Sequence, residues 1–284
     1  MKKRSQVALL ATVVWAGVVS FGAAGEEAVL ADISHIHGIG FDRLNPGNIL
    51  LATHNGLFRA TPDGAVAAVS SDRNDYMGFT PDPADPNRLL ASGHPSAGGN
   101  MGVIVSEDGG TTWAQVATGV DGPVDFHAMT ISRADPRVIY GLYGNIQVSR
   151  DGGMTWSVAG QPPRQIIDLA AAPFAPDSLY AGAANGLFLS ADAGRTWTLV
   201  GPSDVATTMV EVASDGAVFA YFHGAGLFRL ADGRWSQLAS DFGESYLLHL
   251  ATDPSDPAHL VSVTEKSTVL ESKDGGISWD SFGQ

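Results

Sequence analysis

The sequence contains no cysteine among its 284 residues, and this absence excludes two arrangements. Without cysteine the chain has no disulfide framework, and it has no attachment point for the lipid of a lipoprotein anchor. The stability of the fold must therefore come from apolar burial and from closure of the structure.

Positively charged residues are also scarce. The chain has 16 lysine and arginine residues against 30 aspartate and glutamate residues, which gives a net charge of −14. Such a chain is repelled by the phosphate backbone of nucleic acids, so we expect no nucleic-acid partner. A negative field favours the approach of cations, although it serves solubility equally well.

Long hydrophobic runs are missing everywhere except at the start of the chain. Residues 1–25 begin with three basic residues, continue with an apolar run over 7–22, and end in small residues. This pattern is typical of a secretory signal peptide. We expect a mature chain of residues 26–284, periplasmic or secreted, with no membrane span unless the first segment stays uncleaved as an anchor.

What the sequence does contain is a repeated phrase, Ser-x-Asp-x-Gly-x-Thr-Trp, which we call the Asp box. It occurs four times, the last with serine in place of threonine: residues 106–113, 149–156, 190–197 and 272–279. The aspartates are 43, 41 and 82 residues apart, and because 82 is twice 41 a degenerate copy is expected midway. Residues 232–235 (Asp-Gly-Arg-Trp) lie there, and Asp63-Gly64 supplies another worn copy near the start.

Six units of about 40 residues are typical of a β-propeller, in which each unit is one four-stranded blade. Each unit opens with a short apolar strand, most turn at an Asp-Pro or Asn-Pro corner, and each ends in the Asp-Gly hairpin. We predict an all-β fold, a six-bladed β-propeller in one domain. The expected blades are residues 33–72, 73–121, 122–161, 162–202, 203–241 and 242–284.

The Asp box itself has a structural explanation. A short aspartate side chain accepts bonds from amides of the turn, glycine permits a positive φ, and tryptophan packs a large apolar surface beside the hairpin. Because the copies belong to separate blades, we do not expect their aspartates to converge into a catalytic or calcium site.

Histidines recur at equivalent places in the first three units. His37, Met77 and His127 each lie nine residues before the corner proline of their unit. His54 and His94 lie eight residues after it. Since the start of the first strand and the end of the second meet at one end of a blade, these side chains are expected at one mouth of the central channel.

These side chains predict a metal site, because imidazole and thioether groups are transition-metal ligands and the thioether favours copper. Copper is the expected ion, with zinc as the alternative. The expected ligands are His35, His37, His54, Met77, His94 and His127. Asp75 and Asp125, two residues before Met77 and His127, are expected to orient imidazole N–H groups. The alternative is that all of these side chains only line the channel.

Three other histidines are interpreted differently. His249 lies eight residues before its proline, so its side chain is expected to face the other way and to pack inside a blade. His223 lies on a returning strand whose register the sequence leaves open. His259 follows Pro257 in a corner and is expected to be solvated.

With six units and repeated Asp boxes, the chain resembles the Asp-box or BNR-repeat propellers, a superfamily that includes sialidases, sortilin-like receptors and photosystem assembly factors. It is also similar to short exported bacterial propellers often labelled glycosyl hydrolase or sialidase-like. The phrases that carry this likeness are residues 35–38, 76–79, 92–95 and 125–127. The resemblance implies a propeller and a glycosidase activity.

A sialidase needs clustered arginines, a Tyr–Glu nucleophile pair and an acid carboxylate. Tyr246 and Glu211, on neighbouring first strands, are the candidates for the catalytic pair. The clustered arginines that a sialidase needs are not found, because no arginine stands on a predicted first strand. Arg43 and Arg133 are expected in corner loops at the other end of the channel.

Three hypotheses therefore stand side by side. The first is an exported propeller that binds a metal ion, in metal handling or as a scaffold, without catalytic residues. The second is a sialidase-like glycosyl hydrolase. The third is a receptor or assembly platform that grips an envelope protein partner. In each case we expect a monomer.

Overall fold

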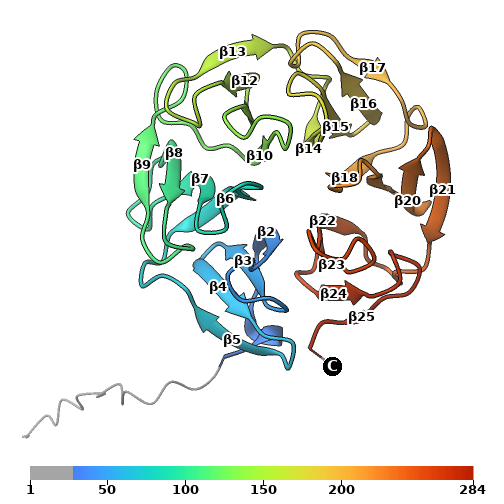
Figure 1. The fold of residues 1–284 in the computed structure, drawn as a ribbon, viewed down its shortest axis with the longest axis horizontal. Helices are drawn as coiled ribbons and strands as arrows, with labels where there is room; N and C mark the ends of the chain where they lie inside the picture. Colours follow the sequence, from blue (N-terminus) through green and yellow to red (C-terminus); the bar gives the residue numbers. More distant parts are fainter. Residues whose placement is uncertain (1–27, 284) are drawn as a thin grey trace, which may run out of the picture.

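The computed structural model describes residues 28–283, and the predicted signal peptide at 1–25 lies outside the described residues. The chain forms six antiparallel sheets around a central axis, which is a six-bladed β-propeller (Figure 1). Within residues 28–283 the helical structure is limited to one 3-10 turn, η1 (Leu30–Asp32), and no helix there is long and apolar enough to cross a membrane. The prediction of an all-β six-bladed propeller is confirmed.

Each blade is built from one continuous stretch of chain, with its strands in sequence order from the axis outwards. Blade 1 consists of β2 (Ile36–Phe41), β3 (Ile49–Thr53), β4 (Gly56–Ala60) and β5 (Ala65–Ala68). Blade 2 consists of β6 (Asp75–Pro81), β7 (Leu89–His94), β8 (Val103–Ser106) and β9 (Ala114–Ala117). Blade 3 consists of β10 (Ala128–Ile131), β11 (Ile139–Tyr143), β12 (Asn145–Ser149) and β13 (Ser157–Gly160).

The second half of the chain repeats this arrangement. Blade 4 consists of β14 (Ile166–Ala171), β15 (Leu179–Ala183), β16 (Gly186–Ser190) and β17 (Thr198–Leu199). Blade 5 consists of β18 (Thr207–Val212), β19 (Val218–Phe222), β20 (Gly226–Ala231) and β21 (Arg234–Ala239). Blade 6 consists of β22 (Leu247–Thr252), β23 (Leu260–Thr264), β24 (Val269–Ser272) and β25 (Asp280–Ser281).

The ring closes by packing of blade 6 against blade 1. Strand β1 (Ala28–Val29) adds a fifth strand to the outer edge of blade 1 through β5. At the inner side, the amide of Ile36 donates to the Ser267 hydroxyl at 3.2 Å, and Ile36 shares an apolar cluster with Val263. Closure therefore depends on side-chain burial between the first and last blades.

The hydrophobic core is divided into six clusters, one between each pair of neighbouring blades. Tyr76 and Phe126 are fully buried at the starts of blades 2 and 3. The Asp-box residues Trp113 and Trp156 lie against them, with ring centroids 5.0 and 4.9 Å apart. Each blade is thus held by both of its neighbours.

The Asp boxes fix the outer hairpins in the way their composition predicts. The Ser149 hydroxyl accepts from the amide of Gly153 and donates to the Asp151 carboxylate, while Thr155 and Trp156 complete the turn with bonds to Asp151 and Gly153. Hydrogen bonds from Thr155 lower the pKa of Asp151 to about 2. The same serine, aspartate and tryptophan bonds recur in the boxes at 106–113, 190–197 and 272–279. The four box aspartates bond within their own turns, in four different blades, and share no common centre.

The inner strands carry a register shift close to one end of the channel. In blade 1 it falls between Ile36 and Gly38, so that His37 is the bulged residue. Blades 4, 5 and 6 shift at the corresponding place, whereas blade 2 pairs one residue further and shifts after Met77. A bulge re-aims the side chains around it. These shifts decide which residues of the inner strands face the channel.

Candidate metal centre

Two histidines of blade 1 and one aspartate of blade 2 converge at the mouth of the channel. His37 stands at the bulge of β2, and His54 follows the last residue of β3, where its amide donates to the carbonyl of His35 at 3.1 Å. Asp75 is the first residue of β6 in the next blade. Two neighbouring blades therefore supply the cluster.

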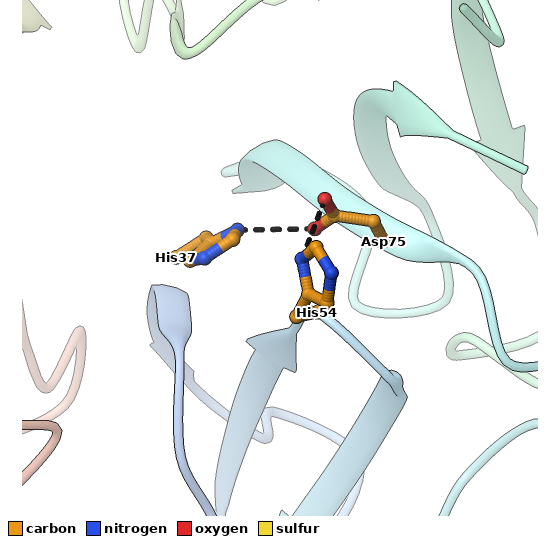
Figure 2. A group of neighbouring side chains, drawn as sticks. All are labelled: His37, His54 and Asp75. Atoms are coloured by element: carbon orange, nitrogen blue, oxygen red, sulfur yellow. Dashed lines mark ion pairs between the residues drawn. The ribbon is translucent and has the colours of Figure 1, made fainter. Parts of the chain in front are cut away.

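The Asp75 carboxylate lies between the two imidazole rings (Figure 2). Its Oδ1 is 3.1 Å from Nδ1 of His37, and its Oδ2 is 2.9 Å from Nδ1 of His54. The ligand atoms of the three residues all lie within 4.8 Å of one another. The side chains of Asp75 and His37 are 10% and 22% exposed, whereas that of His54 is 59% exposed, so the cluster is closed on the blade side and open toward the mouth.

Two of the converging atoms have no aligned hydrogen-bond partner among the described residues. They are Nδ1 of His37 and Oδ1 of Asp75, and both are buried. The two atoms are 3.1 Å apart, but the angles between them do not meet the geometry of a hydrogen bond. Burial lowers the pKa of His37, and the Asp75 carboxylate opposes that effect. Buried polar atoms without partners are rare in folded proteins and indicate a missing ligand or a functional role.

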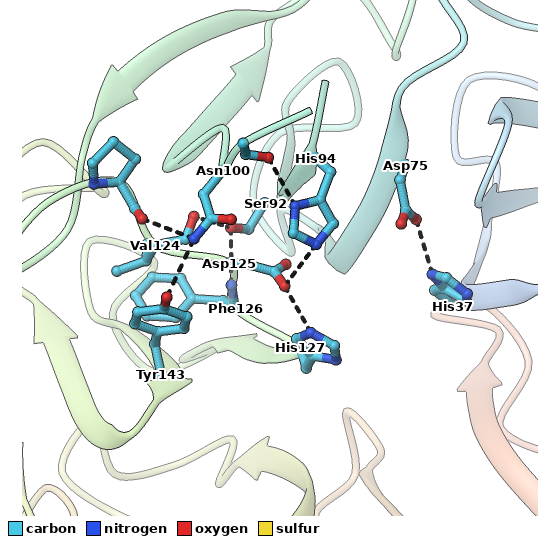
Figure 3. Close-up of polar contacts among 12 residues, drawn as sticks. His37, Asp75, Ser92, His94, Asn100, Val124, Asp125, Phe126, His127 and Tyr143 are labelled. Atoms are coloured by element: carbon cyan, nitrogen blue, oxygen red, sulfur yellow. Dashed lines mark hydrogen bonds and ion pairs between the residues drawn. The ribbon is translucent and has the colours of Figure 1, made fainter. Parts of the chain in front are cut away.

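A second unit of the same composition lies beside the first (Figure 3). Oδ2 of Asp125 is 3.1 Å from Nε2 of His94 and 2.7 Å from Nε2 of His127. The hydrogen bond to Asp125 raises the pKa of His127, with burial opposing it. Both aspartates were expected to serve as partners of the histidines, and the structure makes each of them the centre of its unit.

The remaining predicted ligands lie apart from these contacts. His35 is exposed, with its ring centroid 6.0 Å from that of His54 and a φ of 53°. Gln165, at the corresponding place in blade 4, has a φ of 55°, so this conformation belongs to the blade and not to the site. Met77 pairs with Ser92 ahead of the shifted bulge, and its sulfur takes no part in the ion pairs described above. The bulge of blade 2 lies later along the strand than that of blade 1, so an equal distance from the corner proline does not place Met77 and His37 equivalently.

The structure changes the interpretation of three histidines. His249 lines the channel and does not face away from it, because the bulge between Leu247 and His249 reverses the expected alternation. Burial, and after it the nearby His37, lowers the pKa of His249 to about 4. His223 follows β19 as His54 follows β3, and its ring packs against Tyr246 with centroids 5.3 Å apart.

His259 is not solvated. Its two ring nitrogens lie 3.3 Å from Asp253 and 2.8 Å from Glu271, and its side chain is 17% exposed. His259 immediately precedes β23, which pairs with β24, so its ring reaches Glu271 of that neighbouring strand. This histidine ties a corner to a strand and belongs to the scaffold.

Tyr246 and Glu211 are not brought together as a catalytic pair. Tyr246 immediately precedes β22 at the mouth, whereas Glu211 lies deep in β18, about 15 Å further along the strand direction at roughly 3.3 Å per residue. Inside the channel Glu211 is 3.8 Å from Arg133. Burial raises the pKa values of Glu211 and of Asp168 to about 7.

The corner arginines reach further inward than their loops suggested. Arg133 and Arg43 both line the central cavity, which has a volume of about 180 Å³. Arg43 donates to the carbonyl of Asp82 at 2.7 Å. The channel thus has histidine and aspartate pairs at one mouth and a carboxylate–guanidinium pair deeper inside.

Comparison with known proteins agrees with this architecture. The model of the BNR/Asp-box repeat matches residues 147–158, which contain the Asp box of blade 3. The chain is a β-propeller that carries a BNR/Asp-box repeat. No curated protein matches the sequence of this propeller.

Solved structures share the fold of this Asp-box propeller at low sequence identity. The GH74 enzyme of Niastella koreensis is 17% identical, with a TM-score of 0.64 over 87% of this chain and 45% of that chain. The GH74 xyloglucanase from Xanthomonas campestris is 19% identical, with a TM-score of 0.57 and the same coverage of 87% and 45%. YCF48 bound to D1 peptide is 17% identical, with a TM-score of 0.54 over 87% of this chain and 82% of that one. The present chain spans less than half of either GH74 enzyme, and the likeness concerns the fold alone.

Proposed function

We propose that this propeller binds a transition-metal ion at its channel mouth, with His37, His54 and Asp75 as ligands and copper(II) as the ion. The observation that supports the proposal is the convergence of two Nδ1 atoms on one buried carboxylate, with two of the converging atoms lacking an aligned partner. An ion between them supplies the missing partner for both.

The donor set favours copper(II). Imidazole nitrogen and carboxylate oxygen suit copper(II) and zinc, whereas copper(I) prefers sulfur. Ligand atoms about 2.0 Å from a metal are about 2.8 Å apart at right angles and about 3.3 Å apart in a tetrahedron. The nitrogen–oxygen separations of 3.1 and 2.9 Å lie between these two values, so the spacing admits either geometry. Copper(II) is preferred because it binds such donors more strongly than the other divalent first-row ions do. Zinc is the alternative ion that a titration distinguishes.

The setting that we propose for this site is the cell envelope. The predicted export signal and the strong negative charge both suit a protein that meets free metal ions outside the cytoplasm. The role that we infer is metal handling, with an envelope protein as the candidate receiver or donor of the ion.

The test is a metal titration of the full chain, expressed with its N-terminal segment and purified after export. Copper(II) and zinc are titrated into the stripped protein and into His37→Ala and His54→Ala. His223→Ala is the matched control, since His223 follows a second strand as His54 does but packs against Tyr246 instead of a carboxylate. We expect a tight site that weakens at least tenfold in either ligand variant and is unchanged in the control. Equal affinity in all four proteins would overturn the proposal.

A glycosyl hydrolase is the second candidate, and one observation favours it. Glu211 and Asp168 both line the channel with pKa values raised to about 7, and a carboxyl group in that range can act as a general acid. Hydrolysis of sialyl or other glycosyl reporter substrates that disappears in Glu211→Gln would support an enzyme. A full panel without hydrolysis would reject it and leave metal binding or a protein-binding platform.

A further inference from the structure

In the second unit at the mouth, formed by His94, Asp125 and His127, a backbone carbonyl holds one of the imidazole rings. The ring of His94 is fixed by a backbone carbonyl, because its Nδ1 lies 2.8 Å from the oxygen of Gly99. A carbonyl oxygen only accepts hydrogen bonds, so Nδ1 of His94 carries the hydrogen. In a neutral imidazole the other nitrogen, Nε2, then presents a lone pair.

That lone pair faces a carboxylate oxygen. Nε2 of His94 is 3.1 Å from Oδ2 of Asp125, an oxygen that also has only lone pairs to offer when ionised. Two acceptors at this separation repel each other unless a proton on Nε2 or a metal ion lies between them, and the two cases differ in whether copper(II) binds. A carbonyl that fixes the far nitrogen of an imidazole is the arrangement that orients histidine ligands toward metal ions.

Asp125 is held rigidly in this position. The residue is 5% exposed, and the next amide, that of Phe126, donates to the buried Ser92 hydroxyl at 2.9 Å. Ser92 in turn donates to the carbonyl of Gly102 at 2.8 Å, so that blade 2 clamps the start of blade 3. Oδ1 of Asp125 is buried without a hydrogen-bond partner among the described residues.

His127 is the movable member of the unit. Its Nε2 is 2.7 Å from the same Oδ2 of Asp125, while its side chain is 65% exposed toward the channel (Figure 3). Once its contact with Asp125 is broken, such an exposed ring changes rotamer rapidly. A rigid His94–Asp125 pair with a mobile imidazole beside it can close around an ion that enters from the mouth.

We infer that Asp125, His94 and His127 form a second transition-metal site, distinct from the site at Asp75. It takes a divalent first-row ion, and copper(II) is the probe of choice because it binds such nitrogen and oxygen donors most strongly. The two sites share no ligand, so either can exist without the other. They differ in chemistry as well, since the first uses Nδ1 atoms and the second uses Nε2 atoms.

The two sites also interact through their charges. The like charge of His127 lowers the pKa of His37. The opposite charge of Asp75 raises the pKa of His127. A dication bound at one site therefore repels the second dication. We expect two unequal binding steps in the intact protein and not two identical ones.

The experiment counts copper(II) ions in the full exported chain and in the isosteric variants Asp75→Asn and Asp125→Asn, by calorimetry and by electron paramagnetic resonance. We expect two equivalents in the wild type and one in each variant, with different copper spectra for the two remaining sites. Circular dichroism and a melting curve establish that each variant is folded, and His94→Gln provides a second variant of the same site.

Each other outcome decides between the two sites. One equivalent in the wild type that is lost only in Asp75→Asn overturns the second site and leaves the proposed function standing. One equivalent that is lost in either variant shows a single shared centre and also overturns it. Two equivalents retained in Asp125→Asn and His94→Gln place the second ion elsewhere. No binding in the wild type rejects both proposals together.

Discussion

The hydroxyl of Ser92 in β7 accepts a hydrogen bond from the amide of Phe126, at 2.9 Å, and so joins blade 2 to the residue that follows Asp125. The same hydroxyl donates to the carbonyl of Gly102. This side chain is fully buried, and it connects the packing between two blades with the position of a candidate ligand.

Replacing Ser92 by alanine tests that connection. Ser92→Ala leaves the buried amide of Phe126 and the carbonyl of Gly102 without a partner, which costs about 1–3 kcal/mol in the free energy of unfolding. Copper(II) affinity at Asp125 should fall about 10- to 100-fold, and the site at Asp75 should be unaffected. Urea denaturation and calorimetry measure the two effects. Ser96→Ala, an exposed serine in the following loop, is the control; equal effects in both variants contradict the assignment.

Gly93 lies where the backbones of β6 and β7 come closest. A Cβ built on Gly93 would stand 2.1 Å from the carbonyl oxygen of Asp75, and its φ is +117°. We expect Gly93→Ala to destabilise the protein by more than about 2 kcal/mol, because the clash adds to the backbone strain. It should also weaken metal binding, since the displaced carbonyl belongs to Asp75. Gly98→Ala has a φ of +86° but nothing within 4 Å, so it tests strain without the clash.

The Asp boxes should behave as structural staples that are independent of the channel. Ser149→Ala removes the bond to Asp151 and leaves the buried amide of Gly153 unpaired, which costs about 1–3 kcal/mol in urea unfolding. The exposed Ser157→Ala in the same blade should change stability by less than about 0.5 kcal/mol. Metal affinity should be unchanged in both. A loss of copper binding in folded Ser149→Ala would falsify the separation between staple and mouth.

The channel carboxylates predict how stability depends on pH. Burial raises the pKa of Glu211 from about 4.5 to about 7, with Arg133 opposing the rise. The folded state therefore holds this proton more tightly than the unfolded state, and stability falls as pH rises between about 4.5 and 7. Glu211→Gln should lose that dependence, so that wild type loses about 1–3 kcal/mol more than the variant between pH 5 and pH 8. Urea unfolding at both pH values measures the difference, with the exposed Glu244→Gln as the control. Parallel profiles for wild type and Glu211→Gln would show that this carboxyl group is not responsible.

The architecture could be predicted from the amino-acid sequence. The Asp box is a local motif, since its serine, aspartate, glycine and tryptophan bond within eight consecutive residues, as at Ser149 to Trp156. Its period of about 40 residues therefore reports the blade directly. The spacing from the corner prolines also indicated that histidines of the first three units gather at one mouth, because strand pairs within a blade have fixed lengths.

The contacts between the side chains at that mouth, in contrast, became visible in the folded ring alone. The bulge in β22 reversed the expected direction of His249, and the later bulge in β6 gave Met77 a different position from that of His37. No residue type in the sequence predicts such a shift. The contacts of Asp75 with His54, and of Asp125 with His94, join different blades, whose relative angle follows from the packing of the apolar clusters between them. A pattern within one blade fixes the ends of its strands, but the geometry between blades is a property of the whole ring.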